Sequence, residues 1–195
     1  MLHKKSPPHC SPRYFCFVCV QLNLSHNSIG GYDEPDGYDS DGDQKTKFVA
    51  SPGGVQAIAD ALRVNGSVTC CNVLRNELDV AAAQLLVEAV KDKDVSLTGI
   101  SRNQTSADFR RQRLKSADVV LLASDLSKAG VSASLTCLML GENHIGDAGV
   151  EAIAAALKDN KQSKLAELDL HGFDNGDMKI GPRGASALAD MLAVT

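Results

Sequence analysis

Two stretches of the chain share one alternation of apolar and polar positions. In the segment 138–146, Leu138 and Leu140 alternate with Met139, and the segment 22–30 repeats the pattern. This alternation predicts a short strand with the leucines on one face and Met139 on the other. An asparagine follows each strand, and its amide can satisfy backbone groups that a turn leaves bare. We therefore predict a structural role for the asparagines of this pattern, Asn27, Asn76 and Asn143.

Helical spacing follows these strands. Between Val150 and Leu157, apolar residues recur at i, i+3, i+4 and i+7, which predicts a helix with one apolar face. The segment 54–62 has nearly the same sequence as 149–157. One strand and one helix are too small to bury an apolar face alone, so successive units must stack.

Three weaker copies of the same pattern extend this arrangement over most of the chain. We predict one array over residues 19–195, preceded by a proline-rich, poorly ordered segment at 1–18. The predicted units are 19–67, 68–96, 97–134, 135–164 and 165–195.

The third unit is degraded, and two registers fit it. Either Leu97–Ile100 or Ala107–Phe109 supplies its strand, and we prefer the first because of its spacing from the neighbouring units. Basic residues follow at Arg110, Arg111 and Arg113. They suit an anion or an acidic partner, but a solvated loop is the favoured interpretation because charge runs usually face water.

The first unit contains an acidic insertion at residues 31–47. It is rich in Asp and Gly, which predicts a mobile, solvated loop. Asp39, Asp41 and Asp43 have the spacing of a calcium-binding EF-hand loop. However, Gln44 and Ala50 stand where that loop needs glycine and a bidentate glutamate, so we do not expect calcium binding.

The combination LxxLxLxxNxIG followed by GxxAIAxAL resembles the leucine-rich repeat family, and within it the ribonuclease-inhibitor-like branch. The resemblance covers residues 19–193 and is strongest at 135–157. It implies an α/β fold: a curved, horseshoe-shaped solenoid of about five repeats, with parallel strands on the concave face and helices on the convex face. Family members usually bind partners through the concave face, so the resemblance implies a protein–protein interaction scaffold.

Strand periodicity then predicts which side chains lie on that concave face. The middle of the predicted face is mildly apolar and one end is acidic, as in many recognition surfaces. Glu167 and Asp169 form the acidic end, which suits a basic partner. His171 is close enough to Asp169 to pair with it, and we interpret the pair as surface recognition. The predicted partner-binding residues are Gln21, Asn23, Ser25, Cys70, Asn72, Leu74, Cys137, Met139, Glu142, Glu167, Asp169 and His171.

Composition restricts the partner further. The chain has 20 basic and 24 acidic residues, a net charge of −4, which gives no reason to expect nucleic acid or an anionic membrane as partner. No apolar run approaches the roughly 18 residues of a membrane helix. Adjacent Cys70 and Cys71 would point to opposite faces of a strand, which fits no simple disulfide framework. Reduced thiols and a cytoplasmic location are the simpler expectation.

Catalytic and metal-binding motifs are absent from the sequence. There is no phosphate-binding loop, HExxH or GxSxG, so we expect neither enzyme activity nor a cofactor. Cys16 and Cys19 have the spacing of a zinc pair, but a clear second pair is missing and Cys19 falls on a core position of the pattern. We therefore expect no metal.

The end of the array leaves its assembly and its wider role open. Repeat arrays need polar caps, yet the apolar helix predicted at 184–192 has none. We expect either a longer parent protein or end-to-end self-association. Two functional alternatives remain beside the scaffold: a GTPase-activating regulator of the Ran GTPase-activating protein type, and a fragment of a sensor or receptor protein.

Overall fold

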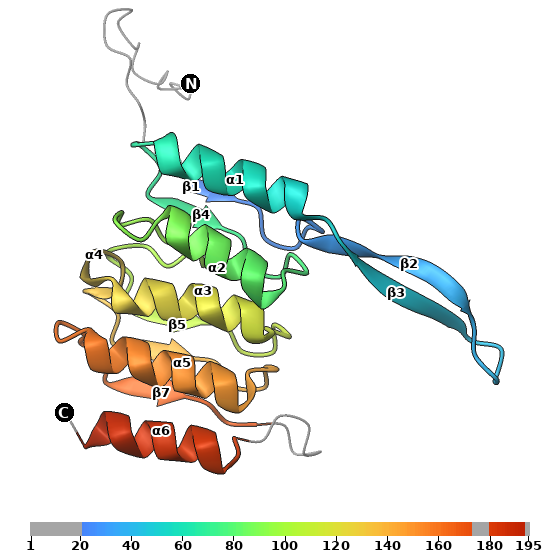
Figure 1. The fold of residues 1–195 in the computed structure, drawn as a ribbon. Helices are drawn as coiled ribbons and strands as arrows, with labels where there is room; N and C mark the ends of the chain where they lie inside the picture. Colours follow the sequence, from blue (N-terminus) through green and yellow to red (C-terminus); the bar gives the residue numbers. More distant parts are fainter. Residues whose placement is uncertain (1–20, 173–179, 194–195) are drawn as a thin grey trace, which may run out of the picture.

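Helices and strands form two layers in the computed structural model, which describes residues 21–172 and 180–193. Five long helices lie side by side in one layer, and short strands line the opposite side (Figure 1). The helices are α1 (Pro52–Val64), α2 (Val80–Ala89), α3 (Ser116–Ser127), the short α4 (Ala129–Ser132), α5 (Gly146–Asp159) and α6 (Pro182–Leu192). The strands are β1 (Gln21–Asn23), β2 (Gly31–Tyr38), β3 (Gln44–Ala50), β4 (Cys70–Asn72), β5 (Ser106–Asp108), β6 (Cys137–Met139) and β7 (Glu167–Asp169).

The apolar pattern places the core between these layers, as predicted. Leu138 and Leu140 are fully buried, whereas Met139 between them is half-buried on the outer side of the strand. Val150 and Ile153 of α5 are also fully buried against this core. The prediction of a mixed α/β arrangement with parallel strands and a helix layer is confirmed.

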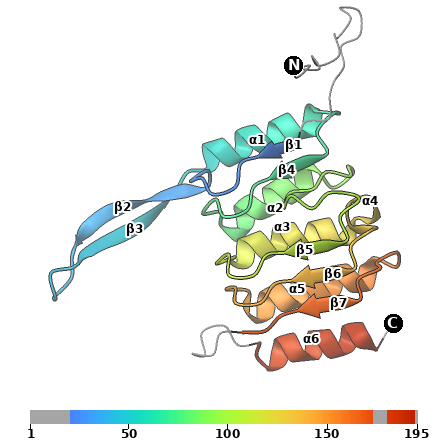
Figure 2. The ribbon, with the colours of Figure 1, turned by 180° about the vertical axis from the view of Figure 1, so that it is seen from behind.

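The parallel strands form two separate sheets. β1 pairs with β4, and β6 lies between β5 and β7 (Figure 2). In the second sheet, Met139 is aligned with Asp108 on one side and Asp169 on the other. Because aligned residues of parallel strands share a face, these three side chains belong to one surface. We call the side of the strands that faces away from the helices the strand face.

The strand of the third unit is the alternative that we did not prefer. β5 spans Ser106–Asp108, so the register based on Leu97–Ile100 is wrong for the strand that pairs with β6. Leu97 and Ile100 are nevertheless buried, and Ser96 makes a single parallel bridge to Cys70 of β4. The third unit first runs beside β4 at Ser96 and forms β5 only from Ser106. It therefore has two strand-like segments.

Because the two segments do not pair with each other, the parallel strands are interrupted here. A buried carboxylate accepts the hydrogen bonds of the first segment instead. Asp125 of α3 accepts hydrogen bonds from the backbone N of Leu97 and of Thr98, each at 3.0 Å. The hydroxyl groups of Ser96 and Thr98 donate to the same carboxylate at 2.8 and 2.6 Å. Burial raises the pKa of Asp125, and these hydrogen bonds act against that shift. Within residues 21–172 and 180–193, no backbone hydrogen bond joins Ser96–Thr98 to β5.

The asparagines that follow the strands have the structural role that we predicted. Asn76 Nδ2 donates to the carbonyl oxygens of Val73 in its own unit and Leu24 in the preceding one, both at 2.8 Å. Asn143 donates in the same way to Leu140 and Phe109, at 2.9 and 2.7 Å. Each amide therefore connects two successive units.

The third unit has no asparagine at this position, and a carboxylate takes over part of the role. Asp118 of α3 accepts from the backbone N of Arg75 at 2.7 Å and from that of Lys115 at 2.9 Å. Its side chain is buried, so it connects the second and third units much as the asparagine amides connect their neighbours.

The acidic insertion forms an antiparallel hairpin rather than the mobile loop that we predicted. β2 and β3 pair over most of their length and project from the body beside α1 (Figures 1 and 2). Asp39 closes the turn by accepting from the backbone N of Asp41 at 3.0 Å and of Asp43 at 2.9 Å. The Asp41-Gly42 step between β-prone residues is a hairpin signal that the acidic composition outweighed in our prediction. We call residues 31–50 the arm.

The end of the molecule at α6 exposes apolar surface. Gly184 is the buried residue of α6, whereas Leu192 is 67% exposed. A cavity of about 770 Å³ opens between α5, β7 and α6, and Leu168 and Leu188 are among the residues that line it. None of the helices in the described residues is long and apolar enough to cross a membrane. The predictions for residues 1–18, including Cys16, and that for Cys19 lie outside the described residues.

Candidate partner-binding site

The predicted partner-binding residues differ in how much surface they offer. Glu167 and His171 are exposed, and Glu142 and Asp169 are half-buried. The others of this set that reach solvent are Gln21, Asn23, Ser25, Asn72, Cys137 and Met139. Cys70 and Leu74 are only 8% and 3% exposed, so they offer a partner little surface.

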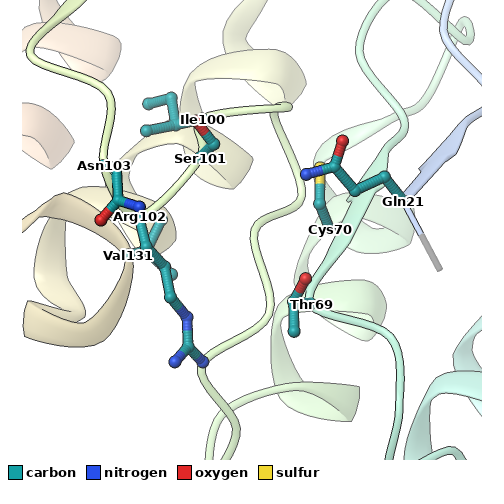
Figure 3. A pocket seen from close by; sticks show the side chains of 8 residues that line it. All are labelled: Gln21, Thr69, Cys70, Ile100, Ser101, Arg102, Asn103 and Val131. Atoms are coloured by element: carbon teal, nitrogen blue, oxygen red, sulfur yellow. The ribbon is translucent and has the colours of Figure 1, made fainter. Parts of the chain in front are cut away.

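Cys70 lines a small cavity beside the break in the sheet. The cavity has a volume of about 340 Å³. Figure 3 shows Gln21, Thr69 and Cys70 along one side of it and the segment 100–103 with Val131 along the other. The segment between Ser96–Thr98 and β5 therefore stands beside Cys70, which explains why the strand face is covered there.

The second sheet brings charged side chains together where its strands end. Arg110 follows β5 and pairs with Asp108 through two hydrogen bonds, from Nε to Oδ1 at 3.0 Å and from Nη2 to Oδ2 at 2.7 Å. This two-bond geometry fixes the planar guanidinium group relative to the strand. The pair lies on the same side of the sheet as Asp169, because Asp108 is aligned with Met139 and Met139 with Asp169.

A second series of contacts continues across β6 and β7. Arg111 Nε donates to Glu142 Oε1 at 2.7 Å. Glu142 also contacts His171, whose Nε2 lies 3.4 Å from the same Oε1. His171 Nδ1 lies 2.7 Å from Asp169 Oδ1, which also accepts from the backbone N of His171 at 3.1 Å. We call the set Asp108, Arg110, Arg111, Glu142, Asp169 and His171 the charged row.

Gly141 provides the space that this arrangement needs. The His171 ring lies over Gly141, where any Cβ would collide with it. The next residue, Glu142, has a φ of +56°, a left-handed conformation that directs the chain out of the strand. Gly141 and Glu142 together bring the Glu142 carboxylate between Arg111 and His171.

These contacts lower the pKa values of the carboxylates in the row and raise that of His171. Hydrogen bonds from Arg110 lower the pKa of Asp108 to about 2. Arg111 first, and His171 after it, lower the pKa of Glu142. Asp169, followed by Glu142, raises the pKa of His171. The carboxylates are therefore ionised at neutral pH, and protonation of the imidazole is favoured.

Five residues of the row, all except Asp169, line a polar cavity of about 500 Å³ together with Gln112. Such a hollow suits charged or hydrogen-bonding groups of a ligand rather than an apolar one. In the part of the chain that the structure describes, no group of three or more His, Cys, Asp or Glu side chains is arranged to hold a metal ion.

Our sequence reasoning missed half of this row. It placed Glu142, Asp169 and His171 on the face, but it omitted Asp108 and treated Arg110 and Arg111 as a solvated loop. The choice of Leu97–Ile100 as the strand caused the omission, because it moved β5 off the sheet. The run of basic residues was the signal present in the sequence. Arg113, the last of them, lies instead beside Arg75 and Glu77 in a separate cleft.

Comparison with known proteins identifies one part of the chain. Residues 131–154, from α4 through β6 into α5, match the family described as Leucine Rich repeat. This segment is similar to a leucine-rich repeat. It contains the strand and the turn that carry Glu142. None of the curated proteins compared with the chain matches it. Leucine-rich repeats serve protein–protein interaction in general, which indicates protein partners for this chain.

Proposed function

We propose that the chain is a protein-interaction scaffold that binds its partner through the strand face, with the charged row as the central contact. The observation that carries this proposal is the row itself, six charged side chains that cross three adjacent parallel strands. Their ion pairs form two groups, Asp108 with Arg110 and Arg111 with Glu142, His171 and Asp169, and members of both groups line the same cavity. A face of this kind suits a partner with charges of both signs in a fixed arrangement.

The ion pairs of the row support recognition more than stability. Exposed pairs of this kind contribute about 0–1 kcal/mol each. They do, however, hold Arg110 and Glu142 in defined positions before a partner arrives, which reduces the entropy lost on binding. Glu167, exposed beside the row, adds further negative charge on β7. The β7 side of the face therefore suits a basic segment of the partner.

The proposal includes several finer points. We propose that the strand–helix units form about five repeats of the ribonuclease-inhibitor-like type, stacked as a curved solenoid whose concave side is the strand face. The pairing of each strand with a helix of 10 to 14 residues supports this type. We also propose that the chain acts by binding rather than by catalysis and that its partner is neither nucleic acid nor a membrane, which the net charge of −4 supports for the partner. The free thiols of Cys71 and Cys137 support a cytoplasmic location.

The test compares two doubly charge-reversed baits in affinity capture from native extract. Glu167→Lys with Asp169→Lys changes the strand face, and Asp159→Lys with Asp190→Lys makes the same change in charge on the helix layer. We expect the wild type and the helix-layer control to retain one protein that the strand-face variant loses. The purified partner should then show at least tenfold weaker binding to the strand-face variant, measured by calorimetry.

Equal retention of the same proteins by all three baits would contradict the proposal. Loss of binding in the helix-layer variant alone would place the contact on the opposite side of the molecule. Circular dichroism spectra of both variants must match that of the wild type, so that unfolding does not imitate a loss of contact.

A further inference from the structure

The arm is a sheet of two strands with no third strand or helix covering it among the described residues. It projects away from the body, so both of its faces are open (Figures 1 and 2). An isolated hairpin is at best marginally stable in water. A projecting, uncovered hairpin therefore needs an explanation, and contact with another molecule provides one.

Aromatic residues are concentrated on the arm. Among the described residues the chain has four aromatic side chains, and only Phe109 lies outside the arm. Tyr32, Tyr38 and Phe48 are 49%, 73% and 42% exposed. The core of the body is built from aliphatic residues, so these rings serve no core. Exposed aromatic rings are a feature of binding surfaces.

Each face of the arm places a ring beside a carboxylate. On one face, the Tyr32 hydroxyl donates to Glu34 Oε1 at 2.8 Å. On the other face, Phe48 stands directly opposite Asp33 in the strand register, and its ring covers Gly31. The two faces thus repeat one chemical combination, a flat π surface next to a negative charge.

The charge of the arm specifies the occupant. Residues 31–50 contain six acidic and two basic side chains, a net charge of −4 that equals the net charge of the whole chain. The remaining residues are therefore neutral in total, and the negative charge of the molecule is localised here. Addition of a partner strand at an edge is disfavoured, because Pro35 lacks a donor on β2 and Lys45 and Lys47 lie on β3.

We propose that the arm is a second interaction surface, which binds an arginine-rich segment of a partner protein across its faces. A guanidinium group stacks on an aromatic ring and pairs with a carboxylate at the same time, which matches the Tyr32–Glu34 and Phe48–Asp33 combinations. The ammonium group of lysine stacks on an aromatic ring less well, so arginine is bound in preference to lysine. This surface is separate from the charged row.

The test measures the affinity of the full chain for a fluorescent nona-arginine peptide and a nona-lysine peptide by anisotropy. Three arm variants are compared: Asp33→Asn with Glu34→Gln, Tyr32→Ala with Tyr38→Ala, and replacement of 32–49 by two glycines. Asp159→Asn with Asp190→Asn, on the helix layer, is the matched control for loss of two negative charges.

We expect the wild type and the control to bind nona-arginine at least threefold more tightly than nona-lysine. The charge variant should weaken nona-arginine binding roughly five- to tenfold. The tyrosine variant should reduce the preference for arginine, because only the Phe48 ring then remains to stack on the guanidinium groups, and the excision should abolish binding. Peptide affinity that survives the excision, or that falls equally in the helix-layer control, would overturn the proposal. Loss of the partner by the strand-face variant leaves this result unaffected, so the two proposals fail separately.

Discussion

At the scale of single residues, the charged row connects three strands through side chains that remain open to solvent. Glu142 is the central residue, because its Oε1 contacts both Arg111 and His171. Of these three, Glu142 has the smallest exposed side-chain fraction, 20%, against 76% for Arg111 and 50% for His171. The least exposed of the three side chains thus carries the charge that both neighbours share.

His171 makes the row sensitive to pH. Asp169, followed by Glu142, stabilises its protonated form and raises its pKa. This interaction is therefore fully present below about pH 6.5, the ordinary value for histidine, and is lost as the pH rises through the raised pKa. We expect the titration midpoint of His171, followed by NMR, to lie above the ordinary value and to fall in Asp169→Asn. A midpoint that Asp169→Asn leaves unchanged would show that the pair does not form in solution.

At the scale of elements, the third unit shows that the apolar pattern alone does not determine which segment forms the strand. Apolar periodicity is local, so it predicted the helices and the strands around Leu138 and Leu140. The register of the third unit is not local, because Leu97–Ile100 and Ala107–Phe109 both satisfy the apolar pattern. Only the neighbouring strand decides between them, and the structure uses both segments in different ways.

The prediction for the arm was wrong for a different reason. Its acidic composition predicted a loop, whereas β-prone residues on both sides of an Asp-Gly turn gave the pattern of a hairpin. Composition describes average solvation, but pairing depends on which residues face each other across the strands. Glu34 opposite Lys47 is a favourable pair of this kind, and a compositional argument does not detect it.

The contribution of Asp125 to stability at the break between the two sheets can be tested by substitution. Its replacement by alanine would leave two backbone N–H groups and two hydroxyl groups without their acceptor, each costing about 1–3 kcal/mol when buried. Removing a buried carboxylate offsets part of this loss. We expect Asp125→Ala to reduce the free energy of unfolding by about 3 kcal/mol, measured in urea.

The exposed Asp159 provides the control for this substitution. Asp159→Ala should change the free energy of unfolding by less than about 0.5 kcal/mol, as surface substitutions usually do. A loss of less than about 1 kcal/mol in Asp125→Ala would mean that water can replace the carboxylate at the break.

At the scale of the whole molecule, the structure divides into a nearly neutral body and an acidic arm. The arm leaves the body next to Gly30, whose carbonyl oxygen accepts from the backbone N of Ser51 at 2.8 Å. Gly31 and Ala50 are paired at its base. The two ends of the arm are thus held together by the chain on either side, independently of the residues farther out.

The body should therefore fold without the arm. Replacement of residues 32–49 by two glycines is expected to change the free energy of unfolding by less than about 1 kcal/mol, because the hairpin buries little surface against the body. The positive control is Leu86→Ala, which opens a cavity in the core and should cost about 2–5 kcal/mol. If urea unfolding shows a loss after excision as large as that of Leu86→Ala, the arm belongs to the cooperative core.

The break in the strand ladder before β5 also affects how unfolding spreads from one unit to the next. In a linear array, each unit is stabilised by its immediate neighbours, and unfolding advances from one unit to the next. Residues 96–97 keep backbone hydrogen bonds to the β4 region, but between 96–98 and β5 the Asp125 carboxylate and packing between α2 and α3 take the place of a strand ladder. We therefore expect unfolding to spread across this junction through the Asp125 contacts and the helix layer rather than along a strand ladder. The arm lies on one side of this junction and the charged row on the other, so the Asp125 contacts stand between the two surfaces that we propose.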